Sequence, residues 1–448
     1  MAITIRCVAL VVLLASLSVA AQTATGQIPE DPVQLREAAR QGDVQAKYRL
    51  ARLFEDGAFG VQANMQEAAA WYSSAAAAGH TESQRRLALM HLQGRGVPQS
   101  FDEAQKLFFQ AAQKNDEESQ YQLGQLLLTG RAGEMSVETA IQWFEKAAEA
   151  GHQGAQLELG RLYLEGVHAA RDVERGLSWI QKAANNDHPR SQYLLATLYE
   201  SGGLLPEDPE QARIYFKRAA DAGLPEAQVW LAGWYEREDP PQYGTALRYY
   251  KDAAKQQSAA GSFGVARLNL ERLLHAPNSQ EGLRYLREAV ALDHPEAHYY
   301  IGRMYGSGSL SGGSTKALAH FQHSANLGYA PAMYELALAY YQGTPPLKTN
   351  PGAAAQWWRQ AASAGHIESQ YAFSLLYLSG TGVEKNPGLS FAIANVAAAQ
   401  GHNDAIQLRD RLMATLPADT LRNAQDLSVE LFEQFTGGSD ASARSRLK

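Results

Sequence analysis

Two pairs of histidines are the residues of this sequence whose types and spacing could most readily do chemistry. His294 and His298 are four residues apart, and His320 and His323 are three apart. At these spacings two imidazoles share one face of a helix, where they could bind a metal ion. The first pair lacks the zinc-protease arrangement, because Pro295 stands where that motif has a glutamate. Neither pair comes with a third ligand in the sequence, so we expect no metal site.

Two further segments imitate nucleotide-binding or catalytic motifs. The stretch 306–316 is rich in glycine and serine, but no lysine directly follows Gly313 and no strand precedes it, so we expect an inter-helix loop. Ser445 and Lys448 have the serine–lysine spacing of penicillin-recognising enzymes, but they lie in a polar C-terminal tail. We find no pair of carboxylates and no serine–histidine–aspartate set outside positions that recur along the sequence. We therefore expect no catalytic residue and no cofactor.

The other histidines indicate which elements must position all of these side chains. Six of the 12 histidines directly follow a turn residue that recurs about every 36 residues. These histidines are His80, His152, His188, His294, His366 and His402. The turn residues are Gly42, Gly79, Asn115, Gly151, Asp187, Gly223, Gln257, Asp293, Gly328, Gly365 and Gly401. A side chain that recurs with a repeat is explained by the repeat, as a contact at the start of a helix or a packed imidazole, rather than by catalysis.

The segment Ala140–Gly166 shows how each repeat is built. Its apolar residues recur at three- and four-residue steps on both sides of the Gly151 turn, as expected for two amphipathic helices. Across the chain, small residues stand eleven positions before the turn and four after it, while bulky residues stand eight before it and aliphatic residues eight after it. This alternation lets neighbouring helices pack closely. The sequence predicts an all-α fold, a right-handed solenoid of about ten helix–turn–helix repeats of about 36 residues each.

The repeated pattern Ala-x-x-Trp-Phe/Tyr-x-x-Ala-Ala-x-x-Gly-His-x-x-Ala-Gln-x-x-Leu-Gly-x-Leu-Tyr-x-x-Gly resembles the Sel-one-like repeat, a relative of the tetratricopeptide repeat. The resemblance covers the chain from about Gln34 to Gln407. Known members of that family are mostly adaptors in bacterial envelope assembly, exopolysaccharide export, signalling and host interaction, so the resemblance implies a binding function. A cysteine-rich subgroup pins each repeat with a disulfide, and this chain lacks that device.

The pattern weakens in the two repeats between Gly223 and Asp293. Most repeats end the helix after the turn with a glycine, at Gly57, Gly94, Gly130, Gly166, Gly202, Gly308, Gly343 and Gly380. Glu238 and Arg272 occupy that place in these two repeats. Two interpretations stay open: the solenoid changes its path or is flexible there, or only the loops have degenerated.

The two ends of the chain suggest export and capping. Residues 1–21 contain an apolar core of 11 residues, 7–17, followed by small residues suited to cleavage, and we interpret them as a signal peptide with 22–33 as a linker. Residues 34–407 form the repeats. We expect capping helices over 408–435, with Pro417 starting the second of them, because an open solenoid end would expose its core. Residues 436–448 are polar, and we expect a disordered tail.

Charge and cysteine content narrow the function. The formal net charge of −7 gives none of the basic surface typical of a nucleic-acid-binding protein. Cys7 is the only cysteine, and it lies inside the expected signal peptide and outside a lipobox. The exported protein would then have no disulfide and no stable membrane anchor, which suits an oxidising compartment. We expect a periplasmic protein, with secretion as the alternative.

Positions that the repeat does not fix are the best candidates for binding. On the helix after each turn, the seventh and tenth residues share a face, and this face tends to line the concave surface of tetratricopeptide-type solenoids. Arginine and aromatic side chains are frequent anchors of protein partners. We therefore predict a partner-binding surface of Arg49, Arg52, Glu158, Arg161, Trp230, Arg267, Tyr300 and Arg303. The alternative is a solvated face with charge pairs such as Glu158 with Arg161.

Together these features predict a non-catalytic periplasmic scaffold or adaptor that binds another envelope protein, and the resemblance implies envelope or exopolysaccharide assembly. Two alternatives stay open. One is a secreted factor that engages a host or another cell. The other is an enzyme that hydrolyses cell-wall glycans or β-lactams, an activity proposed for some relatives. The sequence identifies neither the partner nor the oligomeric state.

Overall fold

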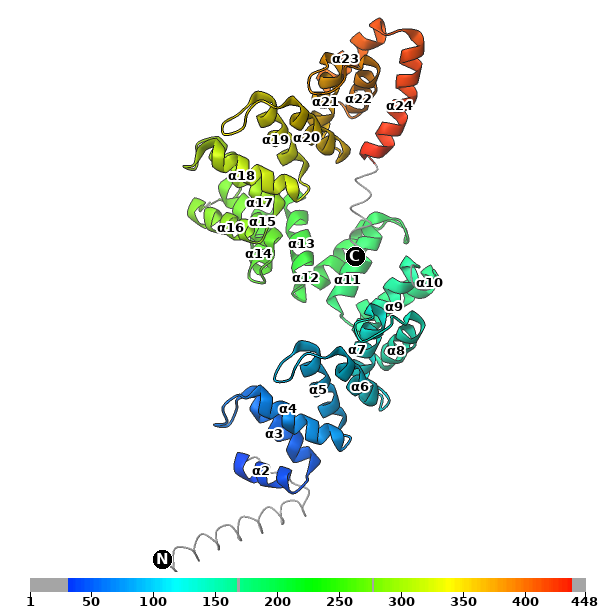
Figure 1. Cartoon of the computed structure of the whole chain (residues 1–448), viewed down its shortest axis with the longest axis vertical. Coiled ribbons are helices and arrows are strands. Elements are labelled where there is room, and N and C mark those ends of the chain that lie inside the picture. Colours follow the sequence, from blue (N-terminus) through cyan, green and yellow to red (C-terminus); the bar gives the residue numbers. More distant parts are fainter. Residues whose placement is uncertain (1–30, 167–169, 276–277, 437–448) are drawn as a thin grey trace, which may run out of the picture. The chain divides into compact units, whose positions relative to one another are not determined.

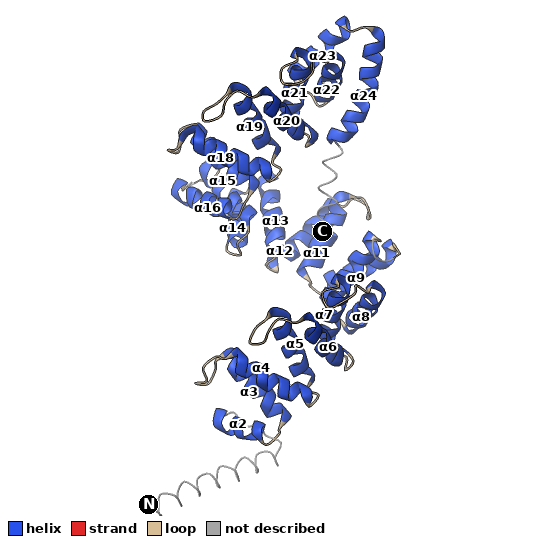
Figure 2. Cartoon of the chain, in the orientation of Figure 1, coloured by secondary structure: helices blue, strands red, loops and turns tan. Residues whose placement is uncertain are grey.

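The computed structural model of this chain describes residues 31–166, 170–275 and 278–436 (Figure 1). Within these ranges the regular secondary structure is entirely helical (Figure 2). The chain divides into two compact units, one up to Leu195 and one from Ala196 onward. Across the described ranges, none of the helices has the length and apolar character needed to cross a membrane.

The helices follow one another without interruption by other elements. The first unit contains α2 (Pro32–Arg40), α3 (Val44–Asp56), α4 (Met65–Ala77), α5 (Thr81–Gln93), α6 (Phe101–Ala112), α7 (Glu117–Thr129), α8 (Val137–Ala150), α9 (Gln153–Glu165) and α10 (Val173–Asn185). The boundary between the units falls inside α11 (Pro189–Ser201). The second unit contains α12 (Pro209–Asp221), α13 (Pro225–Arg237), α14 (Tyr243–Ala254), α15 (Ala259–Leu270), α16 (Ser279–Ala291), α17 (Pro295–Gly306), α18 (Gly313–Asn326), α19 (Ala330–Gln342), α20 (Pro351–Ser363), α21 (Ile367–Ser379), α22 (Pro387–Ala399), α23 (Asn403–Thr415) and α24 (Ala418–Thr436). Taken two at a time along the described chain, α3 to α22 are ten helix pairs, which confirms the predicted helical-repeat architecture.

The turn that sets the repeat register has the backbone conformation that its glycines suggest. All eleven turn residues named above have positive φ. Seven of them are glycines, which adopt this left-handed conformation without a steric penalty. The other four, Asn115, Asp187, Gln257 and Asp293, have φ between 56° and 63°. The sequence spacing therefore located the turn correctly even where glycine is replaced.

The small residues predicted at helix contacts are all buried. The buried small residues at the eleventh position before a turn include Ala68, Ala104, Ala140, Gly176 and Ser390. The buried small residues at the fourth position after a turn include Ser83, Ala155, Gly261 and Ser369. The aliphatic residues eight positions after the turn are buried as well, with Leu159 and Leu195 fully inaccessible. Small residues at these contacts let the helices approach closely, and the aliphatic side chains fill the space between them, as dense packing of a protein interior requires.

Most of the bulky residues eight positions before the turn are less buried than expected, with Tyr215 and Tyr249 as the exceptions. Trp71, Trp143 and Trp179 are only half-buried, whereas the next residue in each repeat, Tyr72, Phe144 or Ile180, is fully buried. The cause is helical geometry: the residue seven before the turn lies one full turn from the buried small residue eleven before it, and the residue eight before it lies on the flank. The residue seven positions before the turn, and not the one eight before it, is therefore the main bulky core residue of these repeats.

The recurring histidines act as helix N-caps, which confirms the interpretation of a contact at the start of a helix. In five of the six, Nδ1 accepts a hydrogen bond of 3.1–3.3 Å from the backbone N–H three residues later. Nδ1 of His188 lies 2.8 Å from the hydroxyl of Ser191. Asp43, Asp116 and Ser258 make the same bond in other repeats. The cap satisfies an N–H group that the helix itself leaves without a partner.

The two irregular repeats keep their helices. Arg272 has a φ of 59°, like the glycines at this position, whereas Glu238 is extended with φ −63° and ψ 156°. Helices α15 and α16 share a buried cluster that includes Phe263, Ala266 and Leu286. The departures at Glu238 and Arg272 therefore fall at helix ends, and apolar residues still form the buried contact between α15 and α16.

The two ends of the described chain are closed in different ways. Helix α2 begins at Pro32 behind the Asp31 cap, so 32 and 33 belong to this helix and not to the expected linker. Proline fits there because the first helical position needs no N–H donor. At the other end α24 follows the break at Pro417 and returns alongside α22 (Figure 1). Its Phe435 is buried with Trp358 of α20. The expected signal peptide lies outside the described residues, as does the expected tail except Thr436.

Candidate partner-binding surface

The eight residues predicted to bind a partner all lie on helices that follow a turn. In the first unit, Arg49 and Arg52 are on α3, and Glu158 and Arg161 are on α9. In the second unit, Trp230 is on α13, Arg267 on α15, and Tyr300 and Arg303 on α17. Their contacts divide them into residues engaged with a neighbouring repeat and residues open to solvent.

Trp230 is engaged with the neighbouring repeat. Its indole stacks on Phe216 of α12, with ring centroids 3.8 Å apart and an angle of 18° between the planes. Its Nε1 donates a hydrogen bond of 2.9 Å to a carboxylate oxygen of Glu200 on α11. Stacking and the hydrogen bond together hold one face and the polar edge of this side chain. Trp230 therefore offers a partner much less surface than an exposed tryptophan would.

Arg267 is engaged in the same way. Its guanidinium donates to Glu236 of α13 over 2.6 Å, and the hydroxyl of Tyr250 on α14 donates to the same carboxylate over 2.7 Å. The Glu236 side chain is only 11% exposed. Burial, together with the carboxylate that accepts from the phenol, raises the pKa of Tyr250. The three residues join three consecutive helices, so Arg267 is part of the packing between repeats.

The first unit contains a matching arrangement. The hydroxyl of Tyr72 on α4 donates to Glu55 of α3 over 2.5 Å, and Arg86 of α5 lies 3.3 Å from the same carboxylate. Burial, together with Glu55, raises the pKa of Tyr72. We call a glutamate that accepts hydrogen bonds from the following repeat in this way a glutamate clamp. The three clamps are centred on Glu55, Glu200 and Glu236, each thirteen residues after its turn.

Two departures from the repeat pattern, not used above to choose candidate residues, indicate the clamps in the sequence. At the clamp position five other repeats have leucine, namely Leu92, Leu128, Leu164, Leu270 and Leu378. A glutamate in an apolar series needs hydrogen-bond donors nearby, and Tyr72 and Tyr250 supply them where Phe108 and Phe144 stand in other repeats. Pairing these two departures from the pattern predicts the clamps at Glu55 and Glu236.

A glycine explains why the two arginine clamps differ in spacing. Arg86 is seven residues after its turn, whereas Arg267 is ten after its own. The seventh position of the later repeat is Gly264, and a Cβ there would lie 2.4 Å from the ring of Tyr250. Because no side chain fits at that position, the cation comes from the next residue on the same helix face.

The remaining first-unit residues differ in exposure. Arg52 pairs with Asp56 of its own helix at 3.0 Å, and Arg161 pairs with Glu165 at 3.5 Å. Glu158 is half-buried, and burial raises its pKa, although the positive charge of Arg161 opposes that shift. Arg52 and Arg161 thus each pair with an acidic residue of their own helix, and the partner of Arg161 in this pair is Glu165. Arg49 is exposed.

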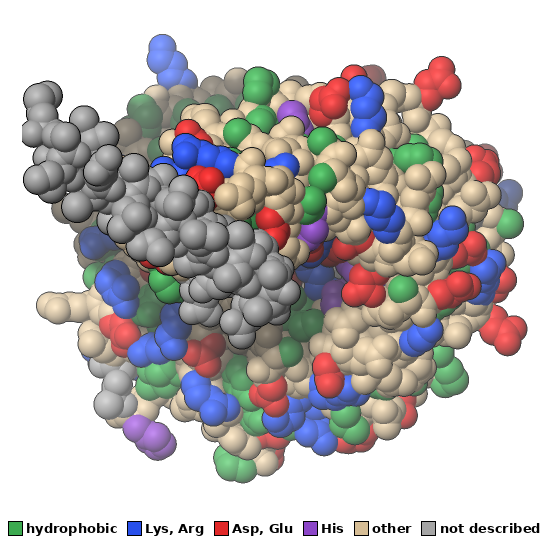
Figure 3. Space-filling model, turned by 90° about the horizontal axis from the view of Figure 1, so that it is seen from below, with side chains coloured by type: hydrophobic (Ala, Val, Ile, Leu, Met, Phe, Trp, Pro, Cys, Tyr) green, Lys and Arg blue, Asp and Glu red, His purple; other side chains and the backbone are tan. Residues whose placement is uncertain are grey.

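On α17 of the second unit, Tyr300 and Arg303 remain accessible. Tyr300 is half-buried, with its ring meeting Phe263 edge-on at 6.2 Å. Arg303 is exposed, and its guanidinium lies 5.9 Å from the centroid of the Tyr299 ring. An arginine beside two tyrosines is the type of surface that anchors protein partners. Elsewhere, acidic and basic side chains are interspersed over the visible face of the molecule (Figure 3).

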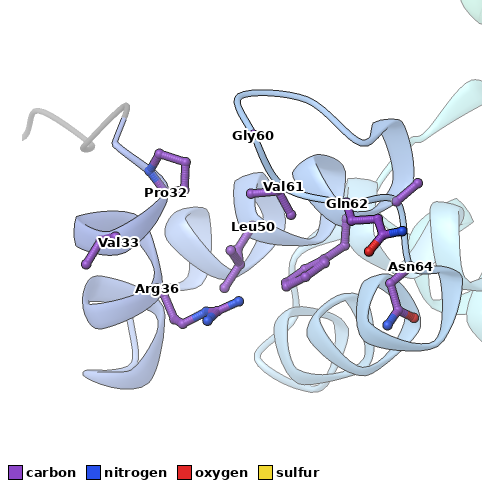
Figure 4. A pocket seen from close by; sticks show the side chains of 10 residues that line it. Pro32, Val33, Arg36, Leu50, Gly60, Val61, Gln62 and Asn64 are labelled. Carbon is purple, nitrogen blue, oxygen red and sulfur yellow. The ribbon is translucent and has the colours of Figure 1, made fainter.

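A pocket near the N-terminal end of the repeats was not anticipated from the sequence. It has a volume of about 470 Å³ and lies between α2, α3 and the loop before α4 (Figure 4). Leu50, Phe54 and Val61 give it apolar walls. Arg36 reaches into it from α2, and its guanidinium lies 5.6 Å from the centroid of the Phe54 ring. The pocket has room for an apolar side chain of a partner, and the Arg36 guanidinium could donate a hydrogen bond to an acceptor beside that side chain.

Candidate metal ligands were dismissed from the sequence for want of a third partner. Among the described residues, Asp293, His298 and His323 form a group whose ligand atoms are close enough to share an ion.

Comparison with protein families matches the helix pairs to one repeat. The model of the Sel1 repeat matches residues 44–80, 81–116, 117–152, 154–188, 189–224, 225–258, 295–329, 330–366 and 367–402. Residues 259–294, which carry the helix pair α15 and α16, lie outside these matches.

Two solved structures show similarity over most of their own length. A protective antigen of uropathogenic Escherichia coli strains with an SLR fold is 27% identical, with a TM-score of 0.67, over 93% of this chain and 89% of that one. A Sel1 repeat protein from Oxalobacter formigenes is 26% identical, with a TM-score of 0.51, over 68% of this chain and 90% of that one.

Two curated proteins match over shorter stretches. The alginate biosynthesis protein AlgK of Pseudomonas syringae pathovar tomato is 25% identical over 190 residues, 41% of this chain and 40% of that protein. An uncharacterised protein of Neisseria meningitidis serogroup B is 30% identical over 164 residues, 36% of this chain and 33% of that protein. The matches thus span a third to two-fifths of the length of these relatives.

Proposed function

This chain belongs to the Sel1 repeat family, and we propose that it is a non-catalytic periplasmic scaffold that binds another protein of the envelope. The observation that carries the proposal is the use of nearly the whole described chain for stacked helix pairs, which offer an extended surface for partners. The similarity to an alginate biosynthesis protein supports exopolysaccharide or envelope assembly as the process. The signal-peptide pattern of 1–21 supports export.

The contacts of the predicted residues sharpen the binding surface. Trp230 and Arg267 belong to glutamate clamps, so replacing them would disturb the packing of the repeats as well as any binding of a partner. Arg49 in the first unit, and Tyr300 and Arg303 in the second, keep accessible surface. We therefore place partner contacts at these three residues.

Site-specific photo-cross-linking in the producing cell tests this proposal. A photoreactive amino acid at Arg49 or Arg303 should give a covalent adduct with one envelope protein, identified by mass spectrometry. The same residue at Arg359, an exposed position on α20 before the turn, is the matched control and should give no such adduct. Adducts that form equally at Arg359, or none at either candidate position, would contradict the assigned surface.

A second candidate function is a secreted factor that engages a host or another cell. The similarity to a protective antigen over 93% of this chain favours it. Fractionation of the producing cells separates the two: periplasmic protein supports the scaffold, and protein in the culture medium or accessible to added protease supports the secreted factor.

A further inference from the structure

Three histidines and one aspartate of the second unit converge between α17 and α18. His298 is on α17, His320 and His323 are on α18, and Asp293 is the left-handed turn residue before α17. The ring of His298 stacks on that of His323 with centroids 4.1 Å apart, and the centroid of His320 is 5.3 Å from that of His298. The fold thus brings the two histidine pairs together and adds an aspartate that the sequence did not connect with them.

The donor atoms have separations suited to one metal ion. Oδ1 of Asp293 lies 2.9 Å from Nε2 of His323 and 3.8 Å from Nε2 of His298. Ligand atoms of the three residues all lie within 4.8 Å of one another. In a tetrahedral site with metal–ligand bonds of about 2.0–2.2 Å, neighbouring donor atoms are about 3.3 Å apart. These two distances lie on either side of that value, so small side-chain rotations would bring the atoms around one ion.

His320 can hold His298 in the ligating tautomer. Their Nδ1 atoms are 3.1 Å apart, a hydrogen-bond distance that works in either direction. Nε2 of His298 also lies 3.2 Å from the carbonyl oxygen of Val290. Without a metal, Nε2–H donates to Val290 and Nδ1 accepts from His320. With a metal, Nε2 uses its lone pair as a ligand and Nδ1–H donates to His320, and both imidazoles stay neutral. A second bond of this kind orients metal-binding histidines in general.

Burial makes the group an anchored but accessible site. His298 is 6% exposed, whereas the side chains of His323 and Asp293 are 47% and 68% exposed. An ion can therefore reach the group from solvent while the buried imidazole fixes one ligand.

The neighbours of the ligand group make other contacts. The nearby Lys316 has its ammonium 5.3 Å from the centroid of the Tyr305 ring, and this ring stacks on His320. The N-cap His294 bonds the start of α17 and is no part of the set.

We propose that Asp293, His298 and His323 bind a divalent transition-metal ion, with His320 as the positioning residue. Two imidazoles and one carboxylate suit Zn²⁺, Ni²⁺ or Cu²⁺, whereas Ca²⁺ and Mg²⁺ take ligand sets made of oxygen. Zn²⁺ is the ion to test first, because three protein ligands leave one position of its tetrahedron for water. Bound metal would tie the start of α17 to α18. The site is independent of the proposed scaffold function.

Titration calorimetry with Zn²⁺ on the full, untagged and chelator-treated protein tests the proposal. We expect one ion per chain, and tetrahedral absorption bands when Co²⁺ is used in place of Zn²⁺. His323→Ala and Asp293→Asn should each weaken binding at least tenfold. Both side chains are exposed, and asparagine already serves as a left-handed turn residue at Asn115, so both variants should fold. His320→Ala should weaken binding about 10- to 100-fold, and His320→Asn, which keeps an acceptor, should restore part of the affinity.

His366→Asn is the matched control, because it alters an N-cap histidine of another repeat and should leave the affinity for Zn²⁺ unchanged. Stoichiometric Zn²⁺ binding that persists unchanged in a folded Asp293→Asn, His323→Ala double variant would overturn the site. Failure of the wild-type protein to bind Zn²⁺, Ni²⁺ or Cu²⁺ would overturn it as well.

Discussion

Equivalent positions of neighbouring repeats make an apolar contact in one unit and a hydrogen-bonded, charged contact in the other. In the first unit, Leu128 of α7 packs with the buried Phe144 of α8, and Arg161 of α9 pairs within its own helix. In the second unit, the equivalent positions hold Glu236, Tyr250 and Arg267, which bind one another across three helices. The two arginines stand at the same place in the repeat, and the second binds a glutamate of the preceding repeat.

The difference shows that a side chain outside the repeat pattern need not be a binding residue. An arginine on this helix face pairs with the preceding repeat when that repeat supplies a buried carboxylate, as Arg267 does with Glu236. Where that repeat supplies a leucine, Arg161 instead pairs with Glu165 of its own helix. A buried glutamate without donors would be costly, so the three residues of a clamp depend on one another. The same rule turns Trp230 toward Glu200, because Phe216 has no hydroxyl to donate.

The largest effect should come from the apolar junction. Leu159 is fully buried in the cluster that contains Phe144, and Leu159→Ala removes its contacts and leaves a cavity. We expect the free energy of unfolding to fall by about 2–5 kcal/mol, measured by urea denaturation. A midpoint equal to that of the wild-type protein would show that Leu159 does not contribute to the core.

Breaking the polar junction should cost somewhat less. Arg267→Ala leaves the carboxylate of Glu236 buried without its cation, and we expect a loss of about 2 kcal/mol in the free energy of unfolding. Arg303→Ala is the matched control, because it removes the same residue type from the same place in the repeat where the side chain is exposed. Its stability should change by less than about 0.5 kcal/mol. Equal effects of the two variants would refute the distinction between clamped and exposed arginines.

The hydroxyl groups of the two tyrosine clamps should have equal and smaller effects. Tyr250→Phe and Tyr72→Phe each keep the ring and remove one hydrogen bond to a carboxylate, so each should lower the free energy of unfolding by about 1–2 kcal/mol. Tyr305→Phe, which alters a tyrosine outside the clamps, serves as control for loss of a hydroxyl. A loss in only one clamp would mean that the two glutamates are not equivalent.

The architecture could be predicted from sequence because it depends on residues that recur. Spacing alone located every turn, including those at Asn115 and Gln257, because a small residue at each close contact and an aliphatic residue opposite it are needed in every copy. The N-cap function of the histidines could be inferred for the same reason. Even 259–294, outside the family matches, forms its helix pair on buried residues such as Val265.

The candidate surface could be predicted only in part, because it depends on contacts between residues far apart in the sequence. Spacing within α13 does not reveal that Trp230 bonds Glu200, because Glu200 lies 30 residues earlier and one repeat away. The histidine group was dismissed because Asp293 was identified only as a turn residue, and the approach of α18 to α17 could not be derived from spacing within either helix. Pairwise departures from the repeat consensus, compared between successive copies, carry that missing information.

The smallest expected effect extends the comparison from junctions to helix caps. His80 in the first unit and His366 in the second occupy the cap position that Asp116 fills in another repeat. Burial lowers the pKa of both histidines, and protonation would remove the Nδ1 lone pair that caps the helix. Because the folded-state pKa lies below that of the unfolded chain, the unfolded state binds more protons as the pH falls below about 6.5. The contribution of these caps to stability is therefore present at pH 7.5 and lost on acidification.

A His80→Asn, His366→Asn variant isolates this contribution, since asparagine caps a helix without titrating. Its free energy of unfolding at pH 7.5 should lie within about 1 kcal/mol of the wild-type value. Between pH 7.5 and 5 the wild-type protein should lose more stability than the variant, and urea denaturation at each pH measures the difference. His275→Asn, at an exposed loop position, is the control and should follow the wild-type profile. If the double variant loses as much stability on acidification as the wild-type protein, protonation of these caps does not govern the acid sensitivity, and the histidine and asparagine caps respond to pH in the same way across this range.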